Sequence, residues 1–148
     1  MRTFTLSSLC LLLFTSCQTP EGGTSIIGKD VLSADEIHLA KRNPDFEKHV
    51  KPILQTKCVM CHTMEAQPNK MSLANRAEAQ RSGAIGGMIV PGNPEQSSLL
   101  MRLGESPTHL KAMPPVGERL TKNEVQILRR WIKNGANWPK GDAGTVQF

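Results

Sequence analysis

Residues 58–62, Cys-Val-Met-Cys-His, constrain this chain more than any other stretch of it. Two cysteines that are separated by two residues and followed directly by a histidine are compatible with three chemistries. The pair can form a redox disulfide, supply half of a zinc site, or attach covalently to a haem. The five residues alone do not decide between these possibilities, so the rest of the chain must.

The N-terminus predicts export from the cytoplasm. Arg2 is followed by an apolar stretch, residues 6–14, which is too short to cross a bilayer, since a spanning helix takes about 20 residues. This arrangement is typical of a secretory signal peptide. The small residues directly before Cys17 resemble the lipobox of bacterial lipoproteins, and this resemblance implies that residues 1–16 are removed and that Cys17 is lipidated. Ordinary secretion and an uncleaved anchor are the alternatives.

The cysteines can be sorted on this basis. Of the four in the chain, Cys10 leaves with the signal peptide and Cys17 takes the lipid. Only Cys58 and Cys61 remain in the mature domain. Two cysteines so close together do not make the disulfide framework of a small secreted protein, so they need another explanation.

Composition points to one small domain with a modest core. The chain has 148 residues, only 4% aromatic residues and no tyrosine, so the core would gain from an added cofactor. The formal net charge is +5, without a block of like charges, and nucleic-acid binding is therefore not indicated. The mild positive charge fits docking to an acidic partner, and it equally fits an ordinary solvated surface.

The mature chain divides into three predicted parts. Residues 17–43 are a lipidated N-terminus, a polar tether and a short helix, which a capping box at Ser33 and Glu36 begins. Residues 44–140 form the main domain, and residues 141–148 are a tail. Strand signals are nearly absent, which predicts an all-α fold.

Helical patterns alternate with long loops in the main domain. The helix after Phe46 should bend at Pro52 or divide into two short helices. Two further helices should begin at Ser72 and after an Asn93 cap, with loops over 83–92 and 105–119. A last helix, capped by Thr121 and Glu124 and ended by Gly135, should pack through an amphipathic stripe. Loops of this length are uncommon unless they have a function.

Weighed in this context, residues 58–62 favour haem attachment. In that chemistry the thiols of Cys58 and Cys61 bond to the haem vinyl groups, and His62 is the proximal iron ligand. A thioredoxin-type pair would sit between a strand and a helix, whereas a helix precedes this pair. A zinc site needs four ligands, and no second pair stands at usable spacing. Both alternatives are weaker, but neither is eliminated.

A second axial ligand is expected on the other face of the haem. Met113 is the leading candidate, because it lies in a loop and Pro114 disfavours helical backbone angles for it. His109, Met88 and Met101 are rivals, and an open iron site or a methionine that only fills a core gap is also compatible with the sequence. The other histidines, His38 and His49, are predicted to lie on the surface.

Several motifs together resemble a known family. FEKHVKPILQTKCVMCH, MIVPGNPEQSSLLMRL and KAMPPVGERLTKNEVQILRRWIKNGANWP follow in order over residues 46–139. They resemble class I cytochrome c, and within it the planctomycete-type cytochrome c domain. The resemblance implies a small helical fold around one covalent haem c, with Cys58 and Cys61 as attachment sites, His62 as proximal ligand and Met113 as distal ligand. It also implies that the first and last helices cross and pack through Phe46, Val50, Leu128 and Trp131.

The expected function is that of an exported, membrane-tethered monohaem cytochrome that carries single electrons and is not an enzyme. Its partners would be redox proteins, and the lipid on Cys17 would hold it at the periplasmic side of a bacterial membrane. A soluble periplasmic or secreted form is the alternative location. The alternative function is a peroxidase-like or sensor subunit with an open iron site. The sequence gives no indication of the oligomeric state.

Overall fold

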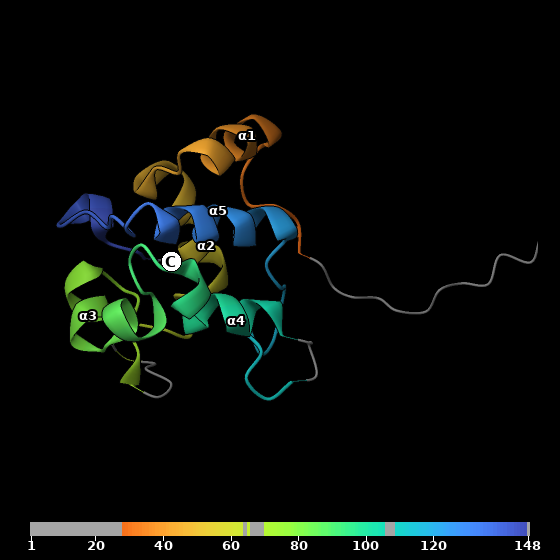
Figure 1. The fold of residues 1–148 in the computed structure, drawn as a ribbon. Helices are drawn as coiled ribbons and strands as arrows, with labels where there is room; N and C mark the ends of the chain where they lie inside the picture. The colour runs from red at the N-terminus through yellow and green to blue at the C-terminus, as the bar shows by residue number, and fades with distance from the viewer. Residues whose placement is uncertain (1–27, 64, 66–69, 106–108, 148) are drawn as a thin grey trace, which may run out of the picture.

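The computed structural model describes residues 28–63, 65, 70–105 and 109–147 (Figure 1). The signal peptide and Cys17 lie outside the described residues. Helix α5 runs through the middle, with α1 on one side of it and α3 and α4 on the other. The helices are α1 (Ala34–Arg42), α2 (Lys51–Lys57), α3 (Arg76–Arg81), α4 (Ser98–Gly104) and α5 (Lys122–Lys133), with short turns η1 (Phe46–Val50), η3 (Ala84–Met88), η4 (Pro94–Gln96) and η5 (Asp142–Gly144) between and after them.

The all-α prediction is confirmed for the described part of the chain. It contains no strand, although an isolated bridge joins Ile85 and Ile89. No helix in this part has both the length and the apolar character needed to cross a membrane.

Helix α1 forms where the sequence predicts it. The Ser33 hydroxyl accepts a hydrogen bond from the Glu36 backbone N–H, and the Glu36 carboxylate accepts one from the Ser33 N–H at 2.9 Å. This reciprocal pair satisfies donors that the first helical turn leaves free. Ile37 and Ala40 are buried where α1 packs against α5. The segment before the main domain is therefore part of the packed structure.

The interruption predicted near Pro52 takes the form of two short consecutive elements. One π turn, η1, passes into α2, and Pro52 lies in the first turn of α2. Proline is tolerated there because the first-turn N–H groups have no partner within the helix. Val50, Ile53 and Leu54 are fully buried, so the two halves still present one continuous apolar side to the core.

Two predicted helix starts are wrong. The helix expected from Ser72 begins at Arg76, with Asn75 as its cap, because residues 71–74 instead bond to neighbouring segments. The helix expected after Asn93 is split into η4 and α4, since Ser97 has an extended backbone (φ −82°, ψ 102°). The buried Ser97 hydroxyl accepts from the Val90 N–H at 2.9 Å, which holds this break in place.

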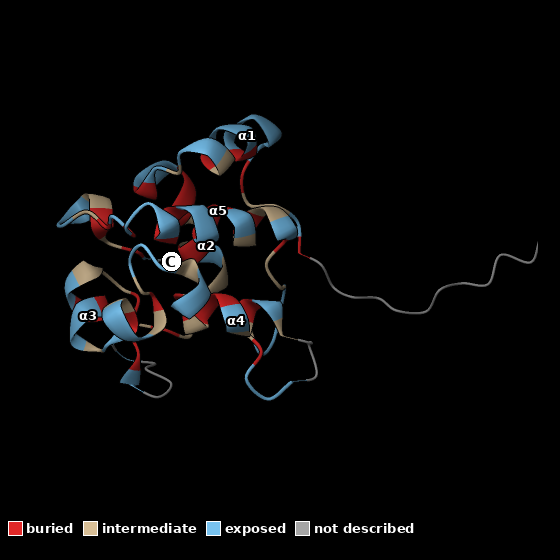
Figure 2. Cartoon of the chain, in the orientation of Figure 1, coloured by how far each residue is buried: buried red, intermediate tan, exposed pale blue. Residues whose placement is uncertain are grey.

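The core is built on the two sides of α5, and Figure 2 shows the buried residues gathered on the facing sides of the helices. Phe46, Trp131 and Trp138 form an aromatic cluster with ring centroids 4.9 to 6.0 Å apart. The last residues join this core, since Val146 is buried and its N–H donates to the Ala74 carbonyl at 2.8 Å.

His49 corrects a prediction. It is buried rather than on the surface, and its Nδ1 accepts from the Asp45 N–H at 2.9 Å. The imidazole thus helps to begin η1, which is a structural role. His38 is exposed, as predicted.

Candidate cofactor-binding site

A cleft of about 450 Å³ lies between the end of α2, residues 71–73, the segment 82–88, α4 and the loop before α5. Most of the side chains that line it are apolar. Cys58, Cys61, His62 and Met113 all line it, although 51 positions separate the histidine from Met113 in the sequence. The residues that line it are Lys57, Cys58, Cys61, His62, Met71, Leu73, Ser82, Gly83, Ala84, Met88, Leu99, Arg102, Leu103, Met113, Pro114, Pro115 and Leu120.

The rival ligands divide into two groups. Met88 also lines the cleft. His109 and Met101 are exposed and are not among the lining residues, and His109 lies 3.7 Å from the Glu105 carboxylate instead. Of the ligands predicted from the sequence, Met113 and Met88 therefore remain as candidates to complement His62, and Met71 is a third methionine that lines the cleft.

Residues 58–62 coil tightly at the end of α2. The Cys58 N–H donates to the Leu54 carbonyl at 3.0 Å, which continues the helix by one bond. The N–H groups of Cys61 and His62 then donate to the Cys58 carbonyl at 3.2 and 3.1 Å. This coil brings both cysteines and the histidine to the same cleft, and neither thiol forms a disulfide.

The His62 ring is buried in a way that suits a metal ligand. Its exposed fraction is 9%, and its Nδ1 atom is buried without a hydrogen-bond partner among the described residues. Burial lowers the pKa of His62, which favours the neutral ring. The Met71 backbone acts in the opposite direction and has the smaller effect. A neutral imidazole is the form that binds metal ions, so this side chain fits a proximal ligand.

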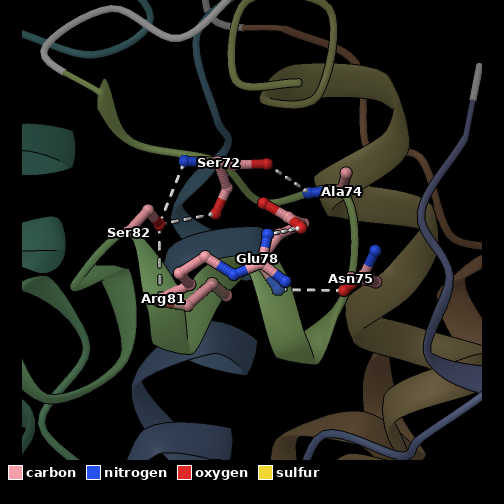
Figure 3. Close-up of polar contacts among 7 residues, drawn as sticks. Ser72, Ala74, Asn75, Glu78, Arg81 and Ser82 are labelled. Atoms are coloured by element: carbon pink, nitrogen blue, oxygen red, sulfur yellow. Dashed lines mark hydrogen bonds and ion pairs between the residues drawn. The ribbon is translucent and has the colours of Figure 1, made fainter. Parts of the chain in front are cut away.

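One wall of the cleft is held by serine hydrogen bonds (Figure 3). The Leu73 N–H donates to the His62 carbonyl at 2.8 Å. Next to it, the Ser72 N–H donates to the Ser82 hydroxyl at 3.1 Å, and this hydroxyl in turn donates to the Ser72 carbonyl at 3.3 Å. Ser72 is fully buried. Residues 71–73 therefore link His62 to the end of α3.

Two side-chain contacts hold helix α3, which adjoins this wall. The Asn75 side chain accepts from the Glu78 N–H at 2.9 Å and so begins the helix. The Glu78 carboxylate, which is mostly buried, pairs with Arg81 at 2.5 Å. The wall is thus ordered by its own contacts.

Met113 lines the cleft from the loop before α5. Its backbone N–H donates to the Arg102 carbonyl at 3.0 Å, which attaches the loop to α4. Arg119 strengthens the same junction, because its guanidinium donates to the carbonyls of Leu103 and Glu105 at 3.1 and 2.7 Å. Cationic donors at a helix C-terminus satisfy free carbonyls and complement the helix dipole. Sequence reasoning missed Arg119, which no local motif marks.

Lys57 is a second residue that sequence reasoning missed. It precedes Cys58, its side chain is only 3% exposed, and its ammonium lies 2.8 Å from the Glu118 carboxylate. The hydrogen bond and charge of Lys57 hold the pKa of Glu118 below its ordinary value. This ion pair joins the end of α2 to the loop that carries Met113. A lysine in a sequence predicts exposure by default, so only the fold reveals the pair.

Cys58 is held as a thiol. Burial, and after it the negative charge of Glu124, raise the pKa of Cys58 from 9.0 to about 12. A redox-active cysteine needs the opposite, a pKa lowered toward neutrality. The electrostatics of the site therefore disfavour the thioredoxin-type alternative.

The residues present fit a covalently attached haem. The cleft is mainly apolar, two free thiols stand at one end of it, and a buried imidazole nitrogen has no partner. The Met113 thioether belongs to the lining of the same cleft. This donor set is the one that His/Met-ligated haem proteins use. Among the described residues, no group of three or more histidine, cysteine, aspartate or glutamate side chains is placed to hold a metal ion.

Comparison with known proteins agrees with this geometry. Residues 58–117 match the family described as planctomycete cytochrome C. The match begins at Cys58 and includes every residue assigned above to the cleft except Lys57 and Leu120. Searches among curated proteins and among solved structures gave no match.

Proposed function

We propose, from the premise that residues 58–117 form a cytochrome c segment of the planctomycete type, that this protein is a monohaem cytochrome that carries single electrons. One observation carries the proposal. Cys58, Cys61, His62 and Met113 line a single apolar cleft, which is what one covalent haem with two axial ligands requires.

A haem supplies one-electron chemistry when it is bound, because its iron changes between two oxidation states. The chain's own residues do the rest. Cys58 and Cys61 anchor the group at the end of α2, and His62 presents a neutral ring nitrogen. The apolar walls would exclude water, and Met113 would supply the second ligand. A thioether ligand raises the reduction potential relative to other ligation, which suits a carrier.

The alternative function, an open iron site for peroxidase-like chemistry or sensing, is less well supported. It requires one axial position to be free for a small molecule. Both Met113 and Met88 line the cleft, and the Met113 segment is attached to α4 through Arg102 and Arg119. A segment fixed in this way favours permanent ligation over an open position.

The location follows from the N-terminal sequence. We propose that residues 1–16 are removed, that Cys17 carries lipid, and that residues 18–25 tether the domain at the periplasmic side of a bacterial membrane. Attachment of haem to cysteines outside the cytoplasm agrees with export. Its partners would then be membrane-bound or periplasmic redox proteins. A Cys17→Ser variant should leave the membrane fraction and keep its haem.

The decisive test of haem attachment is expression in a host that has the c-type maturation machinery, followed by denaturation and mass spectrometry. We expect the polypeptide to keep one haem under conditions that release non-covalent haem. The Cys58→Ala/Cys61→Ala double variant, treated identically, should lose it. A mature chain that carries no haem would remove the proposed function and return the two thiols to redox or zinc chemistry.

A further inference from the structure

A second hollow, of about 670 Å³, lies away from the haem cleft and shares no lining residue with it. It is bounded by the last two turns of α5, the end of α1 and the segment 92–96. The residues that line it are Lys41, Gly92, Asn93, Pro94, Glu95, Gln96, Gln126, Arg129, Arg130 and Lys133. We call it the basic cleft.

The walls of the basic cleft are joined to each other. The Gly92 N–H donates to the Ile132 carbonyl at 2.8 Å, which fixes the 92–96 segment to α5. Gly92 has φ +81°, a backbone conformation that residues other than glycine rarely adopt. Arg129 forms an ion pair with Glu95 across the same gap. The shape of this cleft is therefore set before anything binds.

The charge in the basic cleft is unbalanced. Glu95 is its one acidic lining residue, and Arg129 already pairs with it. Lys41, Arg130 and Lys133 have no ion-pair partner in the described part of the chain. Arg130 and Lys133 are exposed and Lys41 is partly exposed, so all three are available to a ligand.

We propose that the basic cleft binds an acidic, extended segment of a partner protein. Three unpaired cations match carboxylates in charge, and the amides of Asn93, Gln96 and Gln126 offer hydrogen bonds to a peptide backbone. A concave site suits a narrow segment, whereas a bilayer surface is broad and would meet protruding side chains instead. Because the haem cleft lies elsewhere, a partner held here leaves the haem accessible for electron transfer.

The test uses the mature holoprotein and a fluorescently labelled oligoglutamate peptide, with binding followed by fluorescence anisotropy at low salt. A Lys41→Gln/Arg130→Gln/Lys133→Gln variant should bind the peptide about tenfold more weakly, as expected for the loss of three exposed charge pairs. A matched Lys48→Gln/Lys122→Gln/Lys140→Gln variant, which loses the same charge at exposed sites elsewhere, should bind nearly as well as the wild type. A single Gln126→Glu change, which adds a negative charge to the cleft, should also weaken binding.

Three results would overturn the proposal. Equal loss of binding in the two triple variants would mean that only net charge matters. No peptide binding by the wild type would leave the basic cleft without the proposed occupant. Binding to anionic phosphatidylglycerol vesicles that depends on the same three cations, without peptide binding, would identify the face as a membrane contact.

Discussion

Burial determines the chemical state of both His62 and Cys58. His62 has a buried, unpartnered nitrogen, and Cys58 has a pKa raised to about 12. Orphaned buried polar atoms are rare in folded proteins, so the His62 nitrogen at the end of α2 is informative. Thioether formation would remove the titrating Cys58 thiol altogether.

The raised pKa gives a prediction for the protein without haem. In an apoprotein that starts at residue 18 and carries Cys61→Ser, Cys58 is the remaining thiol. At pH 8 it should react with iodoacetamide about a thousandfold more slowly than the same chain in urea, because a pKa of about 12 instead of 9.0 leaves that much less thiolate. The raised value also means that this apoprotein loses stability as pH rises above 9.0, since the unfolded chain releases its proton first. Equal reaction rates in the two states would show that the thiol is not held in this environment.

Arg119 provides a second test at a single residue. Arg119→Gln removes charged donors from two carbonyls at the end of α4, which should lower the free energy of unfolding by about 1–3 kcal/mol. It should also loosen Met113, so the methionine-to-iron absorption band of the oxidised holoprotein should weaken. Arg42→Gln, an exposed substitution in the last turn of α1, is the control and should change neither quantity. Loss of stability with an unchanged band would limit Arg119 to a structural role.

At the level of elements, a helix start could be predicted where the residues that determine it are close together in the sequence. The capping boxes of α1 and α5 each need only residues three positions apart, and both formed as predicted. The starts at Ser72 and Asn93 could not be predicted, because Ser72 bonds to Ser82 and Ser97 bonds to Val90. These contacts join separate segments of the chain. Serine and asparagine are also common both at helix caps and in turns, so neither residue marks a helix start by itself.

The Ser72–Ser82 pair is expected to stabilise the wall that holds His62. Ser82→Ala leaves the Ser72 N–H buried without its partner, which should cost about 1–3 kcal/mol in urea unfolding of the holoprotein. Gln80→Ala, an exposed change in the same helix, should stay within about 0.5 kcal/mol of the wild type. Similar midpoints for the two variants would mean that another group satisfies the Ser72 N–H.

For the whole molecule, the sequence predicted the fold class and a single site that contains Cys58, Cys61, His62 and Met113, which line one cleft. It did not predict how residues 28–43 or 141–147 contribute. The Val31 N–H donates to the buried Glu124 carboxylate at 3.0 Å, and Asp30 bonds to Thr121 and Asn123. Such contacts join residues more than ninety positions apart, which no local pattern indicates.

These contacts predict that residues 44–140 are not an independent folding unit. A holoprotein that starts at residue 44 loses the buried side chains of Leu32 and Ile37, which contribute about 1.5–3 kcal/mol each. Its free energy of unfolding should therefore fall by at least about 3 kcal/mol relative to a chain that starts at residue 28. An unchanged denaturation midpoint would mean that α1 is an addition to a self-sufficient domain.

The central claim is that one covalent haem lies in this cleft between His62 and Met113, and near-infrared spectroscopy of the oxidised holoprotein tests it most directly. We expect the methionine-to-iron band in the wild type and in Met88→Leu, and its loss in Met113→Leu with the haem still attached. A band that survives in Met113→Leu and disappears in Met88→Leu would exchange the roles of the two methionines. A wild type that lacks the band would contradict the proposed axial pair.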